Sequence, residues 1–207
     1  MQNRIVRSRA LGAAAVLVTI ATGANAAIVN GDFEAGDTGF TSSYGTNDIT
    51  LPAQYLVVQN DTVHPAWTDF ADHTFGDGSG RFMVVNGTDS GAGPAWAQVV
   101  AVTPNTQYTL SAWFASVFPD APANAEFRVD GVLVAPAFVA PLPPGVWAQN
   151  SVTFNSGAAA SLSLEIWDTN QVFSGNDYAI DDITLVPAPG AAALLGLGTL
   201  VGLRRRR

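Results

Sequence analysis

The chain has 207 residues, of which 17 are Asp or Glu and nine are Arg, with no lysine and no cysteine, so its formal net charge is −8 at pH 7. An acidic chain of this kind is not expected to bind nucleic acid or an anionic membrane, because both require a basic surface. The absence of cysteine excludes stabilisation by disulfides and catalysis by a cysteine nucleophile.

The first 26 residues have the pattern of a secretory signal peptide. Three arginines lie within the first nine residues, an apolar run over 10–20 follows, and Ala24-Asn25-Ala26 comes next. A charged start, a short apolar stretch and a small-residue triplet are in the order that signal peptidase recognises. The apolar run is also shorter than the roughly 20 residues of a spanning helix. We therefore expect export, with cleavage after Ala26.

Residues 27–185 are expected to form one all-β domain. No sustained helical period occurs there, whereas two-residue alternation and turn signals recur. Asp130-Gly131 predicts a hairpin turn. The other segments expected to be strands are 55–58, 81–85, 96–102, 108–115, 126–129, 132–134, 146–154, 162–168 and 178–185. Many short strands separated by turns indicate a single β-sandwich, of the jelly-roll type.

Three tryptophans, Trp113, Trp147 and Trp167, lie out of phase with the aliphatic residues of their own expected strands. They share their faces with polar neighbours, of which Glu165 is a candidate for ligand binding, and Arg128 is a further candidate on the polar face of its own strand. If two of these strands are adjacent, aromatic rings and polar groups line one sheet face, a combination that suits sugar recognition. The alternative is that the tryptophans cover core that is packed under loops.

Catalytic patterns are weak in this chain. His64 and His73 are the only histidines, and neither has a zinc-ligand spacing. Residues 76–80 read G-D-G-S-G, which does not match the G-x-S-x-G nucleophile motif. A glycosidase needs two suitably spaced carboxylates, and 17 acidic residues single out no pair. We therefore expect a protein that binds and does not catalyse.

The last 22 residues have the pattern of a sorting signal. The segment Val186-Pro187-Ala188-Pro189-Gly190 is expected to end the last strand, because proline cannot donate to a β-ladder. An almost wholly apolar stretch over 191–203 follows, and four arginines close the chain. The positive-inside rule predicts that arginines next to an apolar segment stay on the cytosolic side of the membrane. The tail therefore predicts transient anchoring in a membrane through a hydrophobic helix.

This layout resembles the PEP-CTERM sorting signal of Gram-negative bacteria, in a variant that reads V-P-A-P. The resemblance implies that residues 186–207 are a sorting tail and that an exosortase-type sorting enzyme processes the chain near Val186 to Gly190. It also implies a final location at the cell surface or in the extracellular matrix.

The domain itself resembles the galactose-binding-like jelly rolls, the fold of several carbohydrate-binding modules. The segments Asn30-Gly31-Asp32-Phe33-Glu34 at its start and Ala179 to Leu185 at its end carry this resemblance. It implies a structural calcium ion between the first and last strands, with Glu34 and Asp181 as ligands. Asp182 is the alternative ligand, because a register shift of one residue exchanges the two faces of a strand.

A second cation could be held by Asp72, Asp77 and Ser79, although D-G-S-G is also a common turn sequence. Taken together, these patterns predict an exported module that binds extracellular polysaccharide in the manner of a lectin. Two alternatives stay open. One is a structural or adhesive matrix protein without a small ligand, and the other, less favoured, is a glycan hydrolase.

Overall fold

The computed structural model describes residues 27–60, 62–120 and 122–188. Over these ranges the chain forms only β-strands, which confirms the all-β prediction, and it contains no helix that could span a membrane. The expected signal peptide and the part of the expected sorting tail from Pro189 onward lie outside the described residues. The strands are β1 (Gln54–Val58), β2 (Phe82–Asn86), β3 (Pro94–Ala101), β4 (Gln107–Ser116), β5 (Asn124–Val129), β6 (Val132–Leu133), β7 (Phe138–Val139), β8 (Ala148–Asn155), β9 (Ser161–Asp168) and β10 (Tyr178–Pro187).

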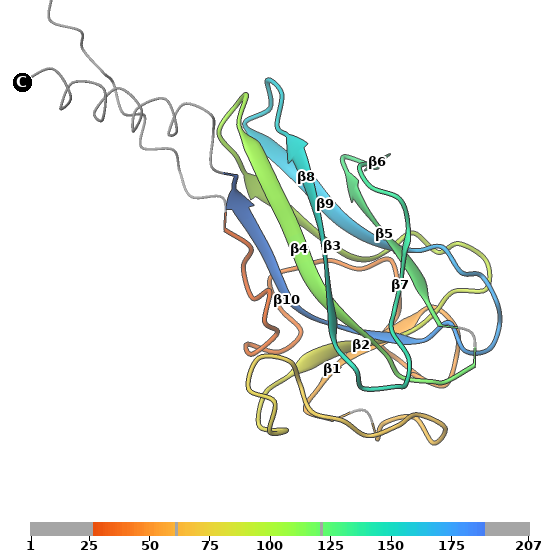
Figure 1. Ribbon diagram of the computed structural model, residues 1–207. Helices are drawn as coiled ribbons and strands as arrows, with labels where there is room; N and C mark the ends of the chain where they lie inside the picture. Colours follow the sequence, from red (N-terminus) through yellow and green to blue (C-terminus); the bar gives the residue numbers. More distant parts are fainter. Residues whose placement is uncertain (1–26, 61, 121, 189–207) are drawn as a thin grey trace, which may run out of the picture.

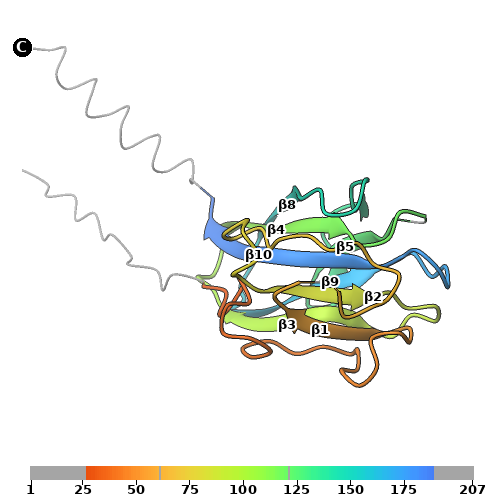
Figure 2. The same cartoon turned by 90° about the horizontal axis from the view of Figure 1, so that it is seen from below.

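Two antiparallel sheets pack against each other as a sandwich (Figure 1). The first sheet has the strand order β1-β2-β10-β4-β8, and the second has the order β3-β9-β5-β6, with β7 also paired to β5. Figure 2 shows the long strands of both sheets running along one common direction.

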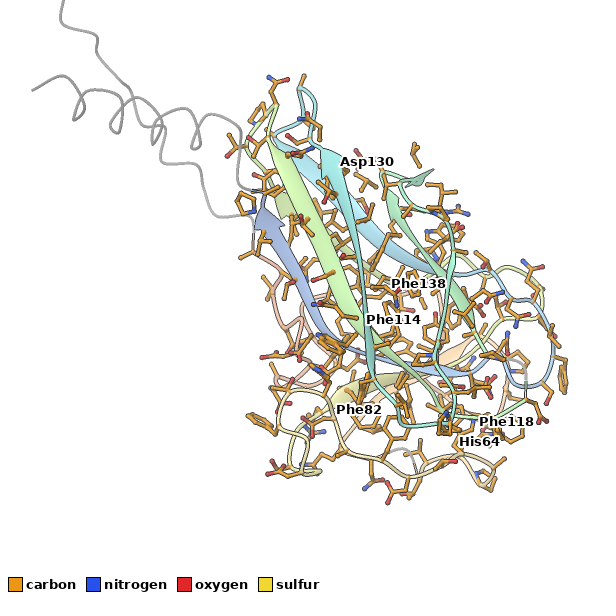
Figure 3. All side chains as sticks on the ribbon, viewed as in Figure 1. His64, Phe82, Phe114, Phe118, Asp130 and Phe138 are labelled. Carbon is orange, nitrogen blue, oxygen red and sulfur yellow. The ribbon has the colours of Figure 1, made fainter. Side chains whose placement is uncertain are left out.

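The main core lies between the sheets and follows the predicted alternation. On β4, Tyr108, Leu110, Ala112 and Phe114 are buried in this core, and on β9 the residues Leu162, Leu164 and Ile166 are buried there too. Phe114 packs on Phe138 with their ring centres 4.4 Å apart (Figure 3). The strand β7, which contains Phe138, was not predicted, because two residues are too few to show a period.

The hairpin between β5 and β6 was predicted correctly. Asp130 and Gly131 have φ values of 50° and 76°, and two positive φ values in succession are the mark of a type I′ turn. The carboxylate of Asp130 also accepts the backbone N–H of Ser163 at 2.8 Å, which joins the turn to β9.

The segments expected to open and close the domain lie side by side. The backbone N–H of Ile183 donates to the carbonyl of Gly31 at 2.8 Å. A Cβ on Gly31 would collide with the Ile183 carbonyl oxygen, so only glycine permits this approach. The register of β10 shifts between Asp181 and Thr184, where Asp182 has a φ of 47°. This bulge changes the directions in which the two adjacent carboxylates point.

The last strand extends two residues beyond the predicted end. Val186 pairs with Thr109 and Pro187 pairs with Tyr108. The expectation that the proline motif ends the strand at Leu185 was therefore wrong. This part of β10 pairs with β4 alone, since β2 reaches only Tyr178 to Ile180. Proline is tolerated where one side of a strand has no partner.

A smaller hydrophobic cluster lies on the outer face of the first sheet, beneath the connection between β1 and β2. Its fully buried members are Ile49, Trp67, Phe82, Val84, Ala115, Val117 and Ala179. Because that connection covers it, the half of the first sheet around β2 is packed on both faces.

Candidate functional site

The outer face of the second sheet brings together several of the residues predicted to bind ligand. Trp167 on β9 pairs with Glu126 on β5, and Glu165 pairs with Arg128. Directly paired residues lie on the same face of a sheet. Because the intervening Ile166 is buried in the core, these four side chains point outward.

These side chains contact one another. The guanidinium carbon of Arg128 lies 4.1 Å from the ring centre of Trp167, and Arg128 also donates from Nε to Glu126 and forms an ion pair with it through Nη2. The indole N–H of Trp167 donates to Glu165 at 2.7 Å, and the hydroxyl of Ser163 donates to the same carboxylate at 3.1 Å. We call Glu126, Arg128, Ser163, Glu165 and Trp167 the Trp167 cluster.

Within the Trp167 cluster, the least exposed carboxylate, that of Glu126, is paired with the positive charge of Arg128. The side chain of Glu126 is 9% exposed and that of Arg128 is 29% exposed. Removing one partner of a buried ion pair commonly costs about 3–5 kcal/mol, because the other charge is left unpaired. Arg128 therefore fixes Glu126. The Nη1 group of Arg128 has no acceptor among the described side chains, so its N–H groups are available to a ligand.

Exposed aliphatic side chains flank the Trp167 cluster on the same face. Val99 pairs with Ser163 and Leu133 pairs with Arg128, and they are 72% and 51% exposed. Neighbouring strands lie about 4.8 Å apart, so the face is about 14 Å wide from β3 to β6. The face therefore presents apolar surface around a polar and aromatic centre.

Trp113 and Trp147 lie on the opposite side of the molecule, on the outer face of the first sheet. His73 stacks on Trp113 with the ring centres 3.8 Å apart. Trp147 packs edge-on against Phe70 and Phe82 and donates to the carbonyl of Ala71 at 3.0 Å.

The three tryptophans therefore do not form one platform. The two-residue alternation of a strand distinguishes inward from outward residues, but it does not tell to which sheet the strand belongs. The outward faces of the two sheets of a sandwich point in opposite directions. Trp113 and Trp147 pack the connection between β1 and β2 onto its sheet. Trp113 also has a polar neighbour, Gln149, but its ring is stacked by His73. The ring of Trp167 is contacted instead by the polar side chains of its own sheet.

The carboxylates expected to bind calcium hold this same connection in place. Asp181 is fully buried, and its Oδ2 accepts the backbone N–H groups of His73 at 2.8 Å and Thr74 at 3.3 Å. Oδ2 of Asp182 lies 2.6 Å from Nδ1 of His73. Burial raises the pKa of Asp181 to about 7, more than the hydrogen bonds from His73 and Asp182 lower it.

Glu34 lies beside a different carboxylate, that of Asp72, and the two meet at Gly80. A Cβ on Gly80 would lie 2.7 Å from Oε1 of Glu34 and closer still to Oδ2 of Asp72. Oε1 of Glu34 accepts the backbone N–H of Arg81 at 2.7 Å, and Oδ2 of Asp72 accepts that of Phe75 at 2.6 Å. The other oxygen of Asp72 is buried without a partner.

Two converging carboxylates and one unpartnered oxygen suit a hard cation such as calcium. They fit it only in part, because no group of three or more His, Cys, Asp or Glu side chains is placed to hold a metal within the described ranges. The expected second cation site is a closed turn, since Asp77 accepts both the backbone N–H and the hydroxyl of Ser79.

A cavity of about 150 Å³, which the sequence did not indicate, lies at one end of the sandwich. The residues that matter for its chemistry are Asn86, Phe118, His64, Trp67, Phe173 and Asp177. The indole N–H of Trp67 donates to Asp177 at 3.0 Å, and His64 stacks on Trp67 with ring centres 4.7 Å apart. These residues come from several separate connections and share no motif, so no sequence pattern could have grouped them.

No protein-family model and no curated protein matches the chain. Among solved structures, the chain is similar to the CBM22-1 xylan-binding domain of Paenibacillus barcinonensis Xyn10C, with 16% identity, a TM-score of 0.52 and coverage of 82% of this chain and 99% of that domain. The tandem CBM22-1–CBM22-2 domain of the same protein gives 16% identity and a TM-score of 0.54 over 82% of this chain, which spans 48% of the tandem.

A Stig cyclase, Fisc from Fischerella sp. TAU, is similar to the same extent. It has 17% identity and a TM-score of 0.52, with coverage of 82% of this chain and 100% of that chain. At these identities the likeness shows a shared fold. Because a xylan-binding domain and a cyclase both have this fold, the function has to be argued from the site.

Proposed function

We propose that this protein binds a carbohydrate chain on the outer face of its second sheet and does not alter it chemically. The observation that carries the proposal is the Trp167 cluster, in which Arg128 lies over Trp167 and donates to Glu126, while Trp167 donates to Glu165. A sugar ring has apolar C–H faces and a rim of hydroxyl groups. It therefore needs aromatic or aliphatic surface close to hydrogen-bond donors and acceptors.

The cluster supplies both kinds of contact. The guanidinium of Arg128 offers N–H donors, and the carboxylate of Glu165 retains free lone pairs for sugar hydroxyls. Hydrogen bonds to ionised groups are about twice as strong as those between neutral groups. Val99 and Leu133 add exposed apolar surface on either side. Because the cluster is already held by internal hydrogen bonds, little side-chain freedom is lost on binding.

The net charge of the domain limits the kinds of polysaccharide that it can bind. Residues 27–188 contain all 17 acidic residues and only two arginines, which gives a charge of about −15 (2 − 17) with histidine neutral. A domain of this charge repels anionic polymers. Neutral polysaccharides are thus the favoured ligands, and xylan is the first to test because a domain of the same fold binds it.

The hydrolase alternative has less support from the residues. A glycosidase needs an acid with a raised pKa next to a second carboxylate. The carboxyl groups whose pKa burial raises are Asp168, Asp177 and Asp181. None of them belongs to the Trp167 cluster, where Glu126 is instead paired with Arg128.

We also propose that the protein acts outside the cell, at the surface or in the matrix of a Gram-negative bacterium. The support for this proposal is the sequence pattern of residues 1–26 and 186–207. The matrix-protein alternative requires the same export but no small ligand, so a binding measurement separates the two.

The binding proposal can be tested by affinity electrophoresis in gels that contain xylan, a neutral glucan or a mannan. A gel that contains a charged polymer is the reference. Trp167→Ala should lower the affinity for the bound polysaccharide at least about tenfold, a loss of about 1.4 kcal/mol. Trp113→Ala is the matched control, because Trp113 is also half-buried but lies on the opposite face of the sandwich.

Two outcomes would reject the proposal. The first is that no polysaccharide retards the protein, which would favour a matrix role without a glycan ligand. The second is that Trp167→Ala binds as tightly as the unaltered protein, which would move the site away from this face. Arg128→Ala is unsuitable as the only test, because it leaves Glu126 buried and unpaired.

A further inference from the structure

The cavity at the end of the sandwich is separate from the Trp167 cluster. Its walls come from the connection before β1, the connection between β1 and β2, the segment after β4 and the connection between β9 and β10. No member of the Trp167 cluster lines it. His64 and Phe118, from two of these connections, lie close together in Figure 3.

Asp177 gives this cavity an unusual electrostatic character. The residue is 8% exposed, and its carboxylate accepts the indole N–H of Trp67 at 3.0 Å and the backbone N–H of Gly87 at 3.1 Å. No arginine of the described chain forms an ion pair with it, and His64, which lines the same cavity, lowers the pKa of Asp177 less than burial raises it. Two neutral donors stabilise the carboxylate only partly, and its burial raises the pKa of Asp177 above the ordinary value.

The rest of the cavity offers surfaces that suit an organic cation. Phe118 and Phe173 both line it, and Phe173 is 75% exposed, so its ring faces are open to a ligand. Thr50 and Asn86 line the same cavity and add polar groups to its wall. The charge of about −15 over residues 27–188 (2 − 17) attracts cations to the whole domain.

We propose that this cavity binds a small organic molecule that carries a primary ammonium group. The ammonium group hydrogen-bonds to Asp177 and supplies the positive charge that this buried carboxylate lacks. The carbon skeleton lies against Phe118 and Phe173, where aromatic faces attract the cation and cover its apolar part. This site goes beyond the proposed polysaccharide face, and each can fail without the other.

The test uses two ligands of the same shape and different charge. The purified protein is titrated at pH 7 with trans-4-aminocyclohexanol and with its uncharged counterpart, trans-cyclohexane-1,4-diol. The readout is the indole N–H signal of Trp67 in a ¹H–¹⁵N spectrum, because this N–H donates to the carboxylate that would hold the ammonium group. Trp67→Phe assigns the signal among those of the five tryptophans.

We expect the amine to shift the Trp67 signal in a saturable manner and the diol to leave it unchanged. Asp177→Asn should weaken amine binding at least about tenfold. Phe173→Ala should weaken it about threefold, the effect of one exposed cation–π contact, without disturbing the fold. Val172→Ser is the matched control for Phe173, because Val172 is exposed, adjacent in sequence and not part of the cavity wall.

Three results would overturn the proposal. Equal shifts with the amine and the diol would identify a site for neutral hydroxylated ligands, and no shift with either would show that the cavity binds neither. Unchanged amine binding by Phe173→Ala would place the amine elsewhere, even if Asp177→Asn fails to fold. Titration of Trp167→Ala with the amine should match the unaltered protein, which separates this test from that of the polysaccharide face.

Discussion

The imidazole of His73 stacks on the indole of Trp113, with the ring centres 3.8 Å apart and the ring planes inclined by 20°. The same imidazole lies 2.6 Å from the carboxylate of Asp182, on the bulge of β10. One residue of the long connection between β1 and β2 therefore contacts β4 and β10 at once. The connection is part of the packed structure, and the tryptophans beneath it have packing partners of their own.

Trp113→Ala should therefore lower the free energy of unfolding by about 2 kcal/mol. Complete burial of a tryptophan makes its truncation to alanine cost about 3–5 kcal/mol, and Trp113 is only half-buried. Urea denaturation monitored by fluorescence measures the change. Affinity for polysaccharide should stay the same, and Trp113→Phe, which keeps a ring under His73, should lose less stability. Lost binding with unchanged stability would show instead that Trp113 belongs to a binding platform.

Calcium should raise the melting temperature of the protein through Glu34 and Asp72. A ligand at about 100 times its dissociation constant stabilises a protein by about 2.7 kcal/mol, which corresponds to a rise of about 5–10 °C for a chain of this size. Differential scanning fluorimetry with calcium and then with a chelator measures the shift. Asp72→Asn and Glu34→Gln should each abolish it.

The calcium experiment also decides between two ligand sets. Asp181 and Asp182 accept hydrogen bonds from His73 and Thr74 without a metal ion. Asp182→Asn should therefore lower the melting temperature with and without calcium but keep the calcium-dependent rise. If Asp181→Asn removes the rise and Asp72→Asn keeps it, the ligand pair implied by the family resemblance, Glu34 and Asp181, is the correct one. Loss of the rise in Asp182→Asn would instead identify the alternative ligand, Asp182. If the unaltered protein shows no rise, calcium is not a ligand of this domain.

The sequence was sufficient to predict nine of the ten strands in the described part of the chain, though not the exact end of β10, and the inward or outward direction of the residues on β4 and β9. Alternation on β4 and β9 correctly separated Leu110 and Leu164 from Trp113 and Trp167. The same alternation could not tell that β4 and β9 belong to different sheets, because long-range pairing leaves no local signal. The three tryptophans were therefore grouped together, although Trp167 lies on the face opposite to the other two.

Sites formed by several loops were beyond the reach of sequence patterns. The pairing of Glu34 with Asp181 came only from the family resemblance, and it stays a prediction. The contact between Glu34 and Asp72 at Gly80 joins two loops that share no motif, so no sequence pattern indicated it. The cavity around Asp177 is similar, since Trp67 precedes Asp177 by 110 residues and contacts it through one hydrogen bond.

The export proposal predicts a defined mature protein. Its N-terminus should lie near Ala27, and Arg204 to Arg207 should be absent, because the sorting enzyme removes the tail. Mass spectrometry of the protein recovered from the native bacterium measures both ends. An arginine-to-alanine variant of the four terminal residues should accumulate as a longer form. An intact chain of 207 residues in the cytosol would contradict the export proposal.

The buried carboxyl group of Asp168 predicts how stability depends on pH. Burial raises its pKa to about 7, more than the hydrogen bonds from Thr88 and Asn170 lower it. In the unfolded chain an aspartate titrates near pH 3.9. Between about pH 4 and pH 7 the folded protein therefore binds more protons at this site than the unfolded protein does. The free energy of unfolding should consequently fall as the pH rises through this window, and the contribution of Asp168 should be constant above it.

Urea denaturation at half-unit steps from pH 4 to pH 8 measures this dependence. Asp177 and Asp181, whose pKa values burial also raises, act in the same direction, so the slope of the unaltered protein is the sum of several groups. Asp168→Asn removes one of them and should make the slope shallower. Asp77→Asn should leave the slope above about pH 5 unaltered, because hydrogen bonds from Ser79 lower the pKa of Asp77 and the unfolded chain is also ionised there. A slope that is unchanged in Asp168→Asn would show that Asp168 is ionised in the folded protein and that its hydrogen bonds outweigh its burial.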